Sequence, residues 1–258
     1  MHGYRNKILR VDLSTNEISD EPINPKIARD FIGGAGYACR ILYDMVDAKT
    51  DPLGPENPLM LMTGPFSGTW VPTGSKMSFC GKSPQTNLWA HSTVGGHLGA
   101  DLKFAGYDGV IITGQSEKPV YLLIHDSVVE IKDAEHLWGK DTAEVWDKLI
   151  DETGLKSPGV ARIGIAGENL VKYANIIVDS YRAAGRGGLG ALMGSKMLKA
   201  IVVKGTDRGV KVADQEALQN YAKHLNEDKS EDTTFNMYSD LGSAGYVDMA
   251  TGMYGSMP

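Results

Sequence analysis

The feature that most constrains the fold is an internal repeat. Residues 96–114, set against residues 187–205, run in parallel without a gap. Gly96, Leu98, Gly99, Ala100 and Gly114 fall on Gly187, Leu189, Gly190, Ala191 and Gly205, and the β-branched run at 110–112 falls on that at 201–203. Each copy reads as a glycine turn, a helix, a buried strand and a closing glycine. The repeat therefore predicts an internally duplicated glycine–helix–strand unit.

The signals around the repeat predict an α+β fold. Alternation at 7–13 and apolar runs at 58–62, 120–124 and 160–166 are typical of strands. Helical spacing runs from 25 to 46 with a break at Gly33–Gly34, and Asp141 with Glu144 forms a capping-box pattern for a helix that ends at Gly154. We expect two mixed β-sheets with outer helices. A change to polar, helical character near 207–212 predicts one domain at 1–208 and the beginning of a second, mainly helical domain at 209–258.

Composition narrows the class of protein. A net charge of −6 argues against a broad nucleic-acid surface, which needs excess Lys and Arg. No apolar run is long enough to span a membrane and the N-terminus has no apolar signal core, so we expect a cytoplasmic protein. Cys39 and Cys80 are expected to be buried, reduced thiols without a metal-binding spacing. Asp101 and Lys103 are interpreted as part of a solvated helix face.

Paired glycines at the helix starts suggest an anion site. Gly95–Gly96 and Gly187–Gly188 would leave backbone N–H groups uncovered at the positive end of a helix, where a phosphate can bind. The alternative is that these glycines only allow helices to pack closely on a sheet. Arg182 and Arg186 bracket the second pair, and arginine holds phosphate well through two hydrogen bonds, so the anion site is favoured. His91 and His97, beside the first pair, are interpreted as polar or packing residues.

Several runs resemble one family. They are DPLGPENP at 51–58, LKFAGYD at 102–108, GENLV at 167–171, RAAGRGGLGA at 182–191 and MGSKMLKA at 193–200. Over about residues 4–206 the chain resembles, in order and spacing, the N-terminal domain of the aldehyde ferredoxin oxidoreductases. This resemblance implies a base for a tungsten bis-pyranopterin cofactor, with molybdenum as an open alternative. It also implies Mg²⁺ bridging the two pterin phosphates.

The resemblance also implies the site residues. Cofactor contacts would fall on Lys76, Thr93, Val94, Gly95, Gly96, Arg182, Ala183, Gly185, Arg186 and Gly187. The backbone carbonyls of Thr93 and Ala183 would contact the Mg²⁺. Two positions depart from the family pattern, because the family usually has Arg in place of Lys76 and Asn in place of Thr93. Lysine keeps the charge but loses the planar fork, whereas a backbone contact at Thr93 survives the change.

The implied reaction is the oxidation of aldehydes to carboxylic acids with ferredoxin, or an electron-transfer subunit, as acceptor. A [4Fe–4S] cluster is expected in a part of the protein beyond Pro258, because its four cysteine ligands are not in this stretch. Two alternatives stay open: the catalytic subunit of a dearomatising aryl-coenzyme A (benzoyl-CoA-type) reductase of the same family, and a non-catalytic pterin-binding subunit. We expect a small-molecule substrate and a homo- or hetero-oligomer, without nucleic-acid binding or a membrane span. The sequence indicates no catalytic residue.

Overall fold

The computed structural model describes residues 1–255, except for the side chains of residues 248, 249, 253 and 254. Contacts within the chain define two units. The first contains residues 1–69 and 73–213, and the second contains residues 70–72 and the chain from 214. Among the described residues, no helix is both long and apolar enough to cross a membrane.

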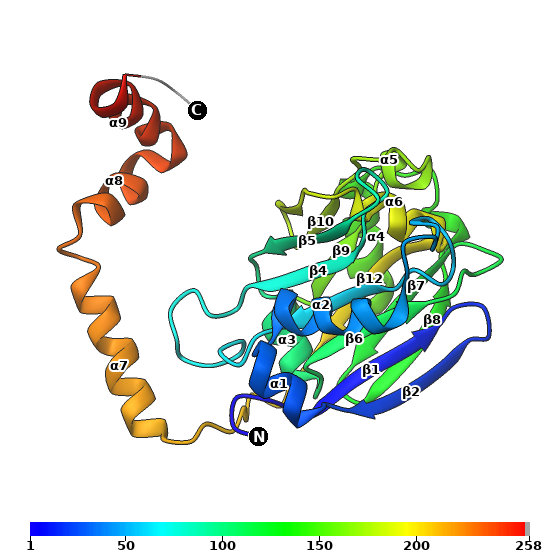
Figure 1. Cartoon of the computed structure of the whole chain (residues 1–258), viewed down its shortest axis with the longest axis horizontal. Helices are drawn as coiled ribbons and strands as arrows, with labels where there is room; N and C mark the ends of the chain where they lie inside the picture. Colours follow the sequence, from blue (N-terminus) through cyan, green and yellow to red (C-terminus); the bar gives the residue numbers. More distant parts are fainter. Residues whose placement is uncertain (256–258) are drawn as a thin grey trace. The chain divides into compact units, whose positions relative to one another are not determined.

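The first sheet has six strands in the order β2-β1-β6-β3-β4-β5 (Figure 1). Its strands are β1 (Lys7–Asp12), β2 (Glu17–Pro22), β3 (Leu59–Thr63), β4 (Met77–Lys82), β5 (Trp89–Val94) and β6 (Gly109–Thr113). Strand β1 pairs with β6 in parallel, and every other neighbouring pair is antiparallel. The sheet is therefore mixed, and β5 forms one of its edges.

The second sheet repeats this arrangement. Its strands are β7 (Val120–His125), β8 (Val128–Asp133), β9 (Gly159–Arg162), β10 (Ile176–Val178), β11 (Arg182–Ala184) and β12 (Leu198–Lys204). Read from its far edge, the order is β8-β7-β12-β9-β10-β11, with β7 and β12 parallel and the other neighbours antiparallel. Each strand has a counterpart in the first sheet, so the predicted duplication is confirmed and extends over both sheets.

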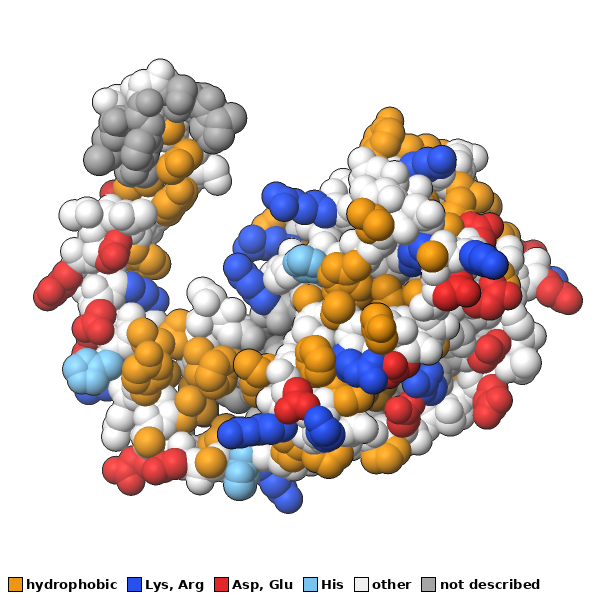
Figure 2. Space-filling view, viewed as in Figure 1, with side chains coloured by type: hydrophobic (Ala, Val, Ile, Leu, Met, Phe, Trp, Pro, Cys, Tyr) orange, Lys and Arg blue, Asp and Glu red, His pale blue; other side chains and the backbone are white. Residues whose placement is uncertain are grey.

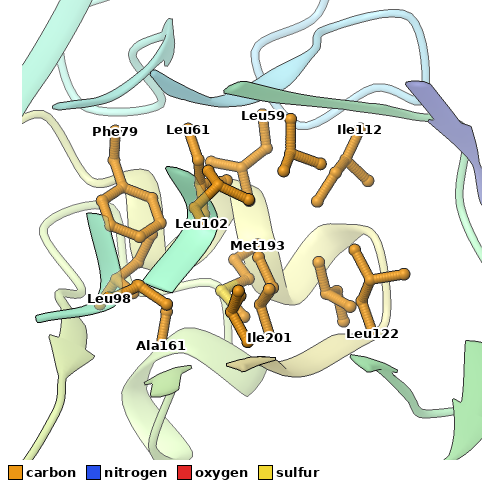
Figure 3. Packing of buried hydrophobic residues seen from close by; sticks show 14 of the residues in the cluster. Leu59, Leu61, Phe79, Leu98, Leu102, Ile112, Leu122, Ala161, Met193 and Ile201 are labelled. Atoms are coloured by element: carbon orange, nitrogen blue, oxygen red, sulfur yellow. The ribbon is translucent and has the colours of Figure 1, made fainter. Parts of the chain in front are cut away.

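Helices cover the outer faces of the sheets and also fill the space between them. Helices α1 (Pro25–Phe31) and α2 (Gly34–Met45) pack on the first sheet, and α4 (Thr142–Thr153), after the short η1 (Glu135–Leu137), packs on the second. The helices of the repeat, α3 (Leu98–Phe104) and α6 (Leu189–Ser195), lie between the sheets. Figure 3 shows Leu98, Leu102 and Met193 between residues of the first sheet and Ile201 of the second. A short helix, α5 (Ile165–Glu168), packs against α6.

Side-chain alternation explains how one strand serves two layers. On β3, Leu59 and Leu61 face the core between the sheets, whereas Met60 and Met62 face α1 and α2. All five residues of β3 are buried, because each face of the strand is covered by helices. Strand β12 repeats this pattern, with Ile201 and Val203 inward and Val202 toward α4.

Two expectations about the solvent exposure of side chains were wrong, one for Asp101 and Lys103 and one for Cys39. Asp101 and Lys103 are not on a solvated face, because α3 lies between the sheets and both side chains are buried. Lys103 pairs with Asp108 and Asp101 pairs with Lys204, which supplies the partners that buried charges require. Cys80 is buried in β4 as expected, and its pKa is raised by burial, but Cys39 on α2 is exposed.

The second unit is helical. It contains α7 (Gln215–Asp228), α8 (Thr233–Leu241), the short η2 (Gly242–Ala244) and α9 (Gly245–Tyr254). Asp214 and Asp232 cap α7 and α8 by accepting hydrogen bonds from backbone N–H groups of the first turn. Residues 256–258 lie outside the described residues.

Candidate functional site

The edge strands β5 and β11 contact each other and join the two sheets. Two hydrogen bonds reinforce this contact: the backbone N–H of Arg186 donates to Ser92 Oγ at 3.2 Å, and Ser83 Oγ donates to the carbonyl of Gly187 at 2.8 Å. We call the line of contact between residues 89–97 and 179–187 the seam. The predicted site residues of both copies lie along it, so the duplication brings together segments almost a hundred residues apart in sequence.

Lys76 reaches the seam through the pairing of β4 with β5. Met77 pairs with Val94, so the preceding Lys76 lies beside Gly95, just past the end of β5. Most of the predicted site residues are solvent-exposed, namely Lys76, Thr93, Gly96, Arg182, Ala183, Gly185 and Arg186. Val94 differs, because its side chain is buried in the core between the sheets. Only its backbone can therefore contact a ligand.

The exposed side of the seam is positively charged. Within residues 1–255, Lys76, Arg182 and Arg186 make no ion pair, and the Arg182 guanidinium lies 5.2 Å from the ring centroid of Tyr181. Figure 2 shows Lys and Arg side chains gathered over the region of β5. Exposed cations without acidic partners create a local positive potential in a chain whose net charge is −6. This edge of the sheets is suited to an anionic ligand.

The glycines of the seam fall into two groups. A Cβ atom at Gly95 would meet nothing within 4 Å, and one at Gly185 would come no closer than 3.7 Å to Asn175. In contrast, a Cβ at Gly187 would lie 2.6 Å from the Cβ of Ala90, and Gly187 has a φ of +74°. Gly187 is thus required by packing and backbone conformation, whereas the space above Gly95 and Gly185 is open to a ligand.

At the starts of both α3 and α6, one backbone N–H group already has a protein partner. The backbone N–H of His97, which precedes α3, donates to Asp179 at 2.7 Å. At α6, the N–H of Gly190 donates to the carbonyl of Ala174 at 3.0 Å. Protein oxygens therefore already use N–H groups at both helix starts. An anion at the seam would be held mainly by side-chain cations and the open glycine backbone.

The other sequence candidates have structural partners. His97 lies with Nδ1 at 3.2 Å from Asp179 and with Nε2 at 3.2 Å from the carbonyl of Pro158. The ring of His91 stacks on that of Trp89 at a centroid distance of 6.1 Å. Glu168 has structural partners as well, because it forms an ion pair with buried Lys199 and accepts from the N–H of Gly139.

Sequence reasoning missed Ser83, Ser92 and Asp179, which link the two sheets. None of them lies in a motif, and the pairs they form span between 82 and 104 residues. Within the part of the chain that the structure describes, no group of three or more His, Cys, Asp or Glu side chains is placed to hold a metal ion.

The sequence-family model of the aldehyde ferredoxin oxidoreductase N-terminal domain matches residues 8–205, which make up most of the first unit. The chain belongs to this family. A tungsten-containing aldehyde ferredoxin oxidoreductase of Thermococcus kodakarensis is 49% identical over 216 residues, 84% of this chain and 36% of the relative. The chain spans about a third of the length of such curated relatives.

Two further comparisons widen the family. The WOR-like subunit of an aliphatic sulfonate oxidoreductase of Pyrococcus furiosus is 37% identical over 95% of this chain and 41% of its own length. The solved active-site complex BamBC of benzoyl-coenzyme A reductase, with 1,5-dienoyl-CoA, superposes with a TM-score of 0.86 at 38% identity, covering 90% of this chain and 36% of that one. The benzoyl-coenzyme A reductase complex thus contains a chain with the same fold as this one.

Proposed function

We propose that the seam is the base on which a tungsten bis-pyranopterin cofactor lies, in an oxidoreductase that oxidises aldehydes to carboxylic acids with ferredoxin as acceptor. The observation that carries the proposal is the convergence of three exposed cations, Lys76, Arg182 and Arg186, from the two halves of a duplicated fold, where they make no ion pair within residues 1–255. A cofactor with two similar pterins suits a base built from two similar units. Identity of 49% to a tungsten-containing aldehyde ferredoxin oxidoreductase supports this reaction.

The residues present fit such a group. Arg182 and Arg186 can each hold a phosphate through two parallel hydrogen bonds, and Lys76 adds a compact positive charge from the neighbouring strand. The carbonyls of Thr93 and Ala183, one from each edge strand, are proposed to contact a Mg²⁺ between the phosphates, since Mg²⁺ prefers oxygen ligands. When bound, the cofactor would supply the two-electron chemistry, while the chain fixes its position and electrostatic surroundings.

The proposed electron path needs groups outside these 258 residues. The sequence contains two cysteines, whereas a [4Fe–4S] cluster takes four thiolates. We propose that the rest of a longer protein or a partner subunit holds the cluster and passes electrons to ferredoxin. The comparison with relatives about three times as long agrees with this division.

The test is cofactor retention by arginine variants of the full-length protein. Arg182→Ala and Arg186→Ala each remove at least one charge-assisted hydrogen bond of about 1.5–3 kcal/mol, so we expect retention of tungsten and pterin to fall roughly ten-fold or more. Metal analysis and the fluorescence of released pterin are the measurements. Arg29→Ala, an exposed arginine on α1 away from the seam, is the matched control and should keep both. Full tungsten and pterin in both seam variants would refute the proposal.

A second reaction is a candidate because the chain superposes on a benzoyl-coenzyme A reductase complex at 38% identity. That activity would use the same base with a different substrate pocket. Assays of the loaded full-length protein with aldehydes and with aryl-CoA thioesters separate the two. A protein that holds the cofactor yet converts neither class would instead favour the non-catalytic pterin-binding subunit.

A further inference from the structure

Asp179, just after β10, has an unusual backbone conformation. Its φ is +51°, a region that residues other than glycine rarely adopt. The residue is 5% exposed, so its carboxylate is largely removed from water. Such a conformation in a buried, charged residue persists only where the surrounding contacts require it.

Those contacts involve all of the polar groups of Asp179. The carboxylate accepts from the backbone N–H of His97 at 2.7 Å and from that of Val160 at 3.2 Å, and it lies 3.2 Å from the His97 ring nitrogen Nδ1. The Asp179 N–H donates to the carbonyl of Val160 at 2.7 Å, and the Asp179 carbonyl accepts from the Arg162 guanidinium at 2.6 Å. The residue is therefore held rigidly by its own sheet while its carboxylate reaches the first copy.

Gly96 is shaped by the same carboxylate. A Cβ atom at Gly96 would lie 2.1 Å from Oδ2 of Asp179, and the glycine has a φ of +105°. Any larger residue would displace the carboxylate from the turn. The absence of a side chain at Gly96 is thus explained by a contact between the two copies of the fold.

We propose that Asp179 is a positioning residue that sets the spacing between the two halves of the cofactor base. This inference rests on the proposed function of the seam. Asp179 lies three residues before Arg182, and Gly96 lies three residues after Thr93. One buried carboxylate therefore fixes the end of β5 against the turn that leads into β11.

The other links across the seam are weaker in kind. Ser92 Oγ accepts one hydrogen bond and Ser83 Oγ donates one, and both hydroxyls are uncharged. The carboxylate bond to the His97 N–H is charge-assisted and partly buried, and charge-assisted bonds are about twice as strong as neutral ones. Without it, the end of β5 and the turn before β11 would be held together only by neutral hydrogen bonds and by packing, so we expect their separation to vary more.

The experiment is Asp179→Asn in the full-length holoprotein. The amide keeps the size but directs an NH₂ group toward an N–H donor, so one of the contacts with His97 or Val160 is lost. We expect roughly ten-fold lower tungsten and pterin retention with the thermal midpoint within a few degrees of wild type. Asp126→Asn is the matched control. Asp126 also has a φ of +51° and accepts a backbone N–H, from Thr206 at 2.7 Å, but it lies in the β7–β8 turn away from the seam.

A double variant separates positioning from general destabilisation. Because Asp179 acts through the strand of Arg182, Asp179→Asn with Arg182→Ala should lose less than the product of the two single effects. The inference would be overturned if the losses of tungsten in the two single variants multiply in the double variant. Full tungsten content in Asp179→Asn would also overturn it. If Asp179→Asn does not fold, Asp179→Glu keeps the buried charge but moves it, and its tungsten content decides in the same way.

The same measurements distinguish the two failures. If Arg182→Ala and Arg186→Ala keep full tungsten, the proposed function itself fails. If the arginine variants lose tungsten while Asp179→Asn and Asp179→Glu keep it, the base is correct and only the role of Asp179 is wrong.

Discussion

Single lysines in the interior tie loops to the sheets. Lys82 donates to three carbonyls, those of Asp47, Ala48 and Thr50, at 2.8–3.0 Å. Lys196 is fully buried and donates to the carbonyls of Pro55 and Gly114 at 3.2 and 3.1 Å. An ammonium group offers several donors on a flexible stem, so one side chain can satisfy carbonyls from different loops.

Lys196 makes stability depend on pH. Burial lowers its pKa to about 8, whereas the unfolded chain keeps an ordinary value near 10.5. Between these values the unfolded state binds more protons, so the free energy of unfolding rises as the pH rises from 8 to 10. Over this pH range we expect the free energy of unfolding of wild type to rise by at most about 3 kcal/mol, and that of Lys196→Met to lack this rise. Urea unfolding at several pH values is the measurement. The exposed Lys118→Met is the control, and parallel pH profiles for wild type and Lys196→Met would contradict the prediction.

At the scale of elements, locally encoded features could be predicted from the sequence. The start of α4 depends on Asp141 and Glu144, three residues apart, and the structure forms both halves of the capping box. The apolar run that forms most of β3 was likewise recognisable. In contrast, β5 and β11 were missed, because β5 carries mostly small or polar residues and β11 has only three residues. Their place at the seam is set by tertiary contacts, which leave no periodic pattern in the sequence.

The same limit applies to the candidate site. Arg182, Arg186 and the glycines could be selected because arginine and glycine clusters suit phosphate binding and resemble a family motif. Asp179 could not, since its role depends on a partner 82 residues away and on a left-handed backbone conformation. The burial of Lys103 was not predicted for a related reason. Its helix lies between two sheets, and helical spacing alone does not show that both sides of a helix are buried.

The cap of α4 can be tested directly. Asp141→Ala removes the acceptor for the N–H groups of Ala143 and Glu144, so the free energy of unfolding should fall by about 1 kcal/mol. Asp151→Ala, on the exposed last turn of the same helix, should be neutral or slightly stabilising because an acid near the helix C-terminus opposes the helix dipole. Urea midpoints compare the two variants, and equal losses would show that the cap is not the cause.

At the scale of the molecule, the duplicated halves share one core. Each sheet has its own outer layer, but the largest hydrophobic cluster contains residues from both sheets together with α3 and α6 (Figure 3). Neither half can bury its inner face without the other. The duplication therefore built a single cooperative unit, and the edge strands that form the candidate site meet where this shared core ends.

Met193→Ala tests whether the two sheets unfold together. Met193 lies on α6 between the sheets and is fully buried, so its truncation should cost about 2–5 kcal/mol. If the core is shared, native-state hydrogen exchange should show the opening free energy of amides in β3 and β12 falling by the same amount, although they belong to different sheets. Val128→Ala, at an exposed position of β8, should leave both nearly unchanged. A loss confined to β12 would mean that the second sheet opens alone, and the cofactor base would then rest on two separately stable halves.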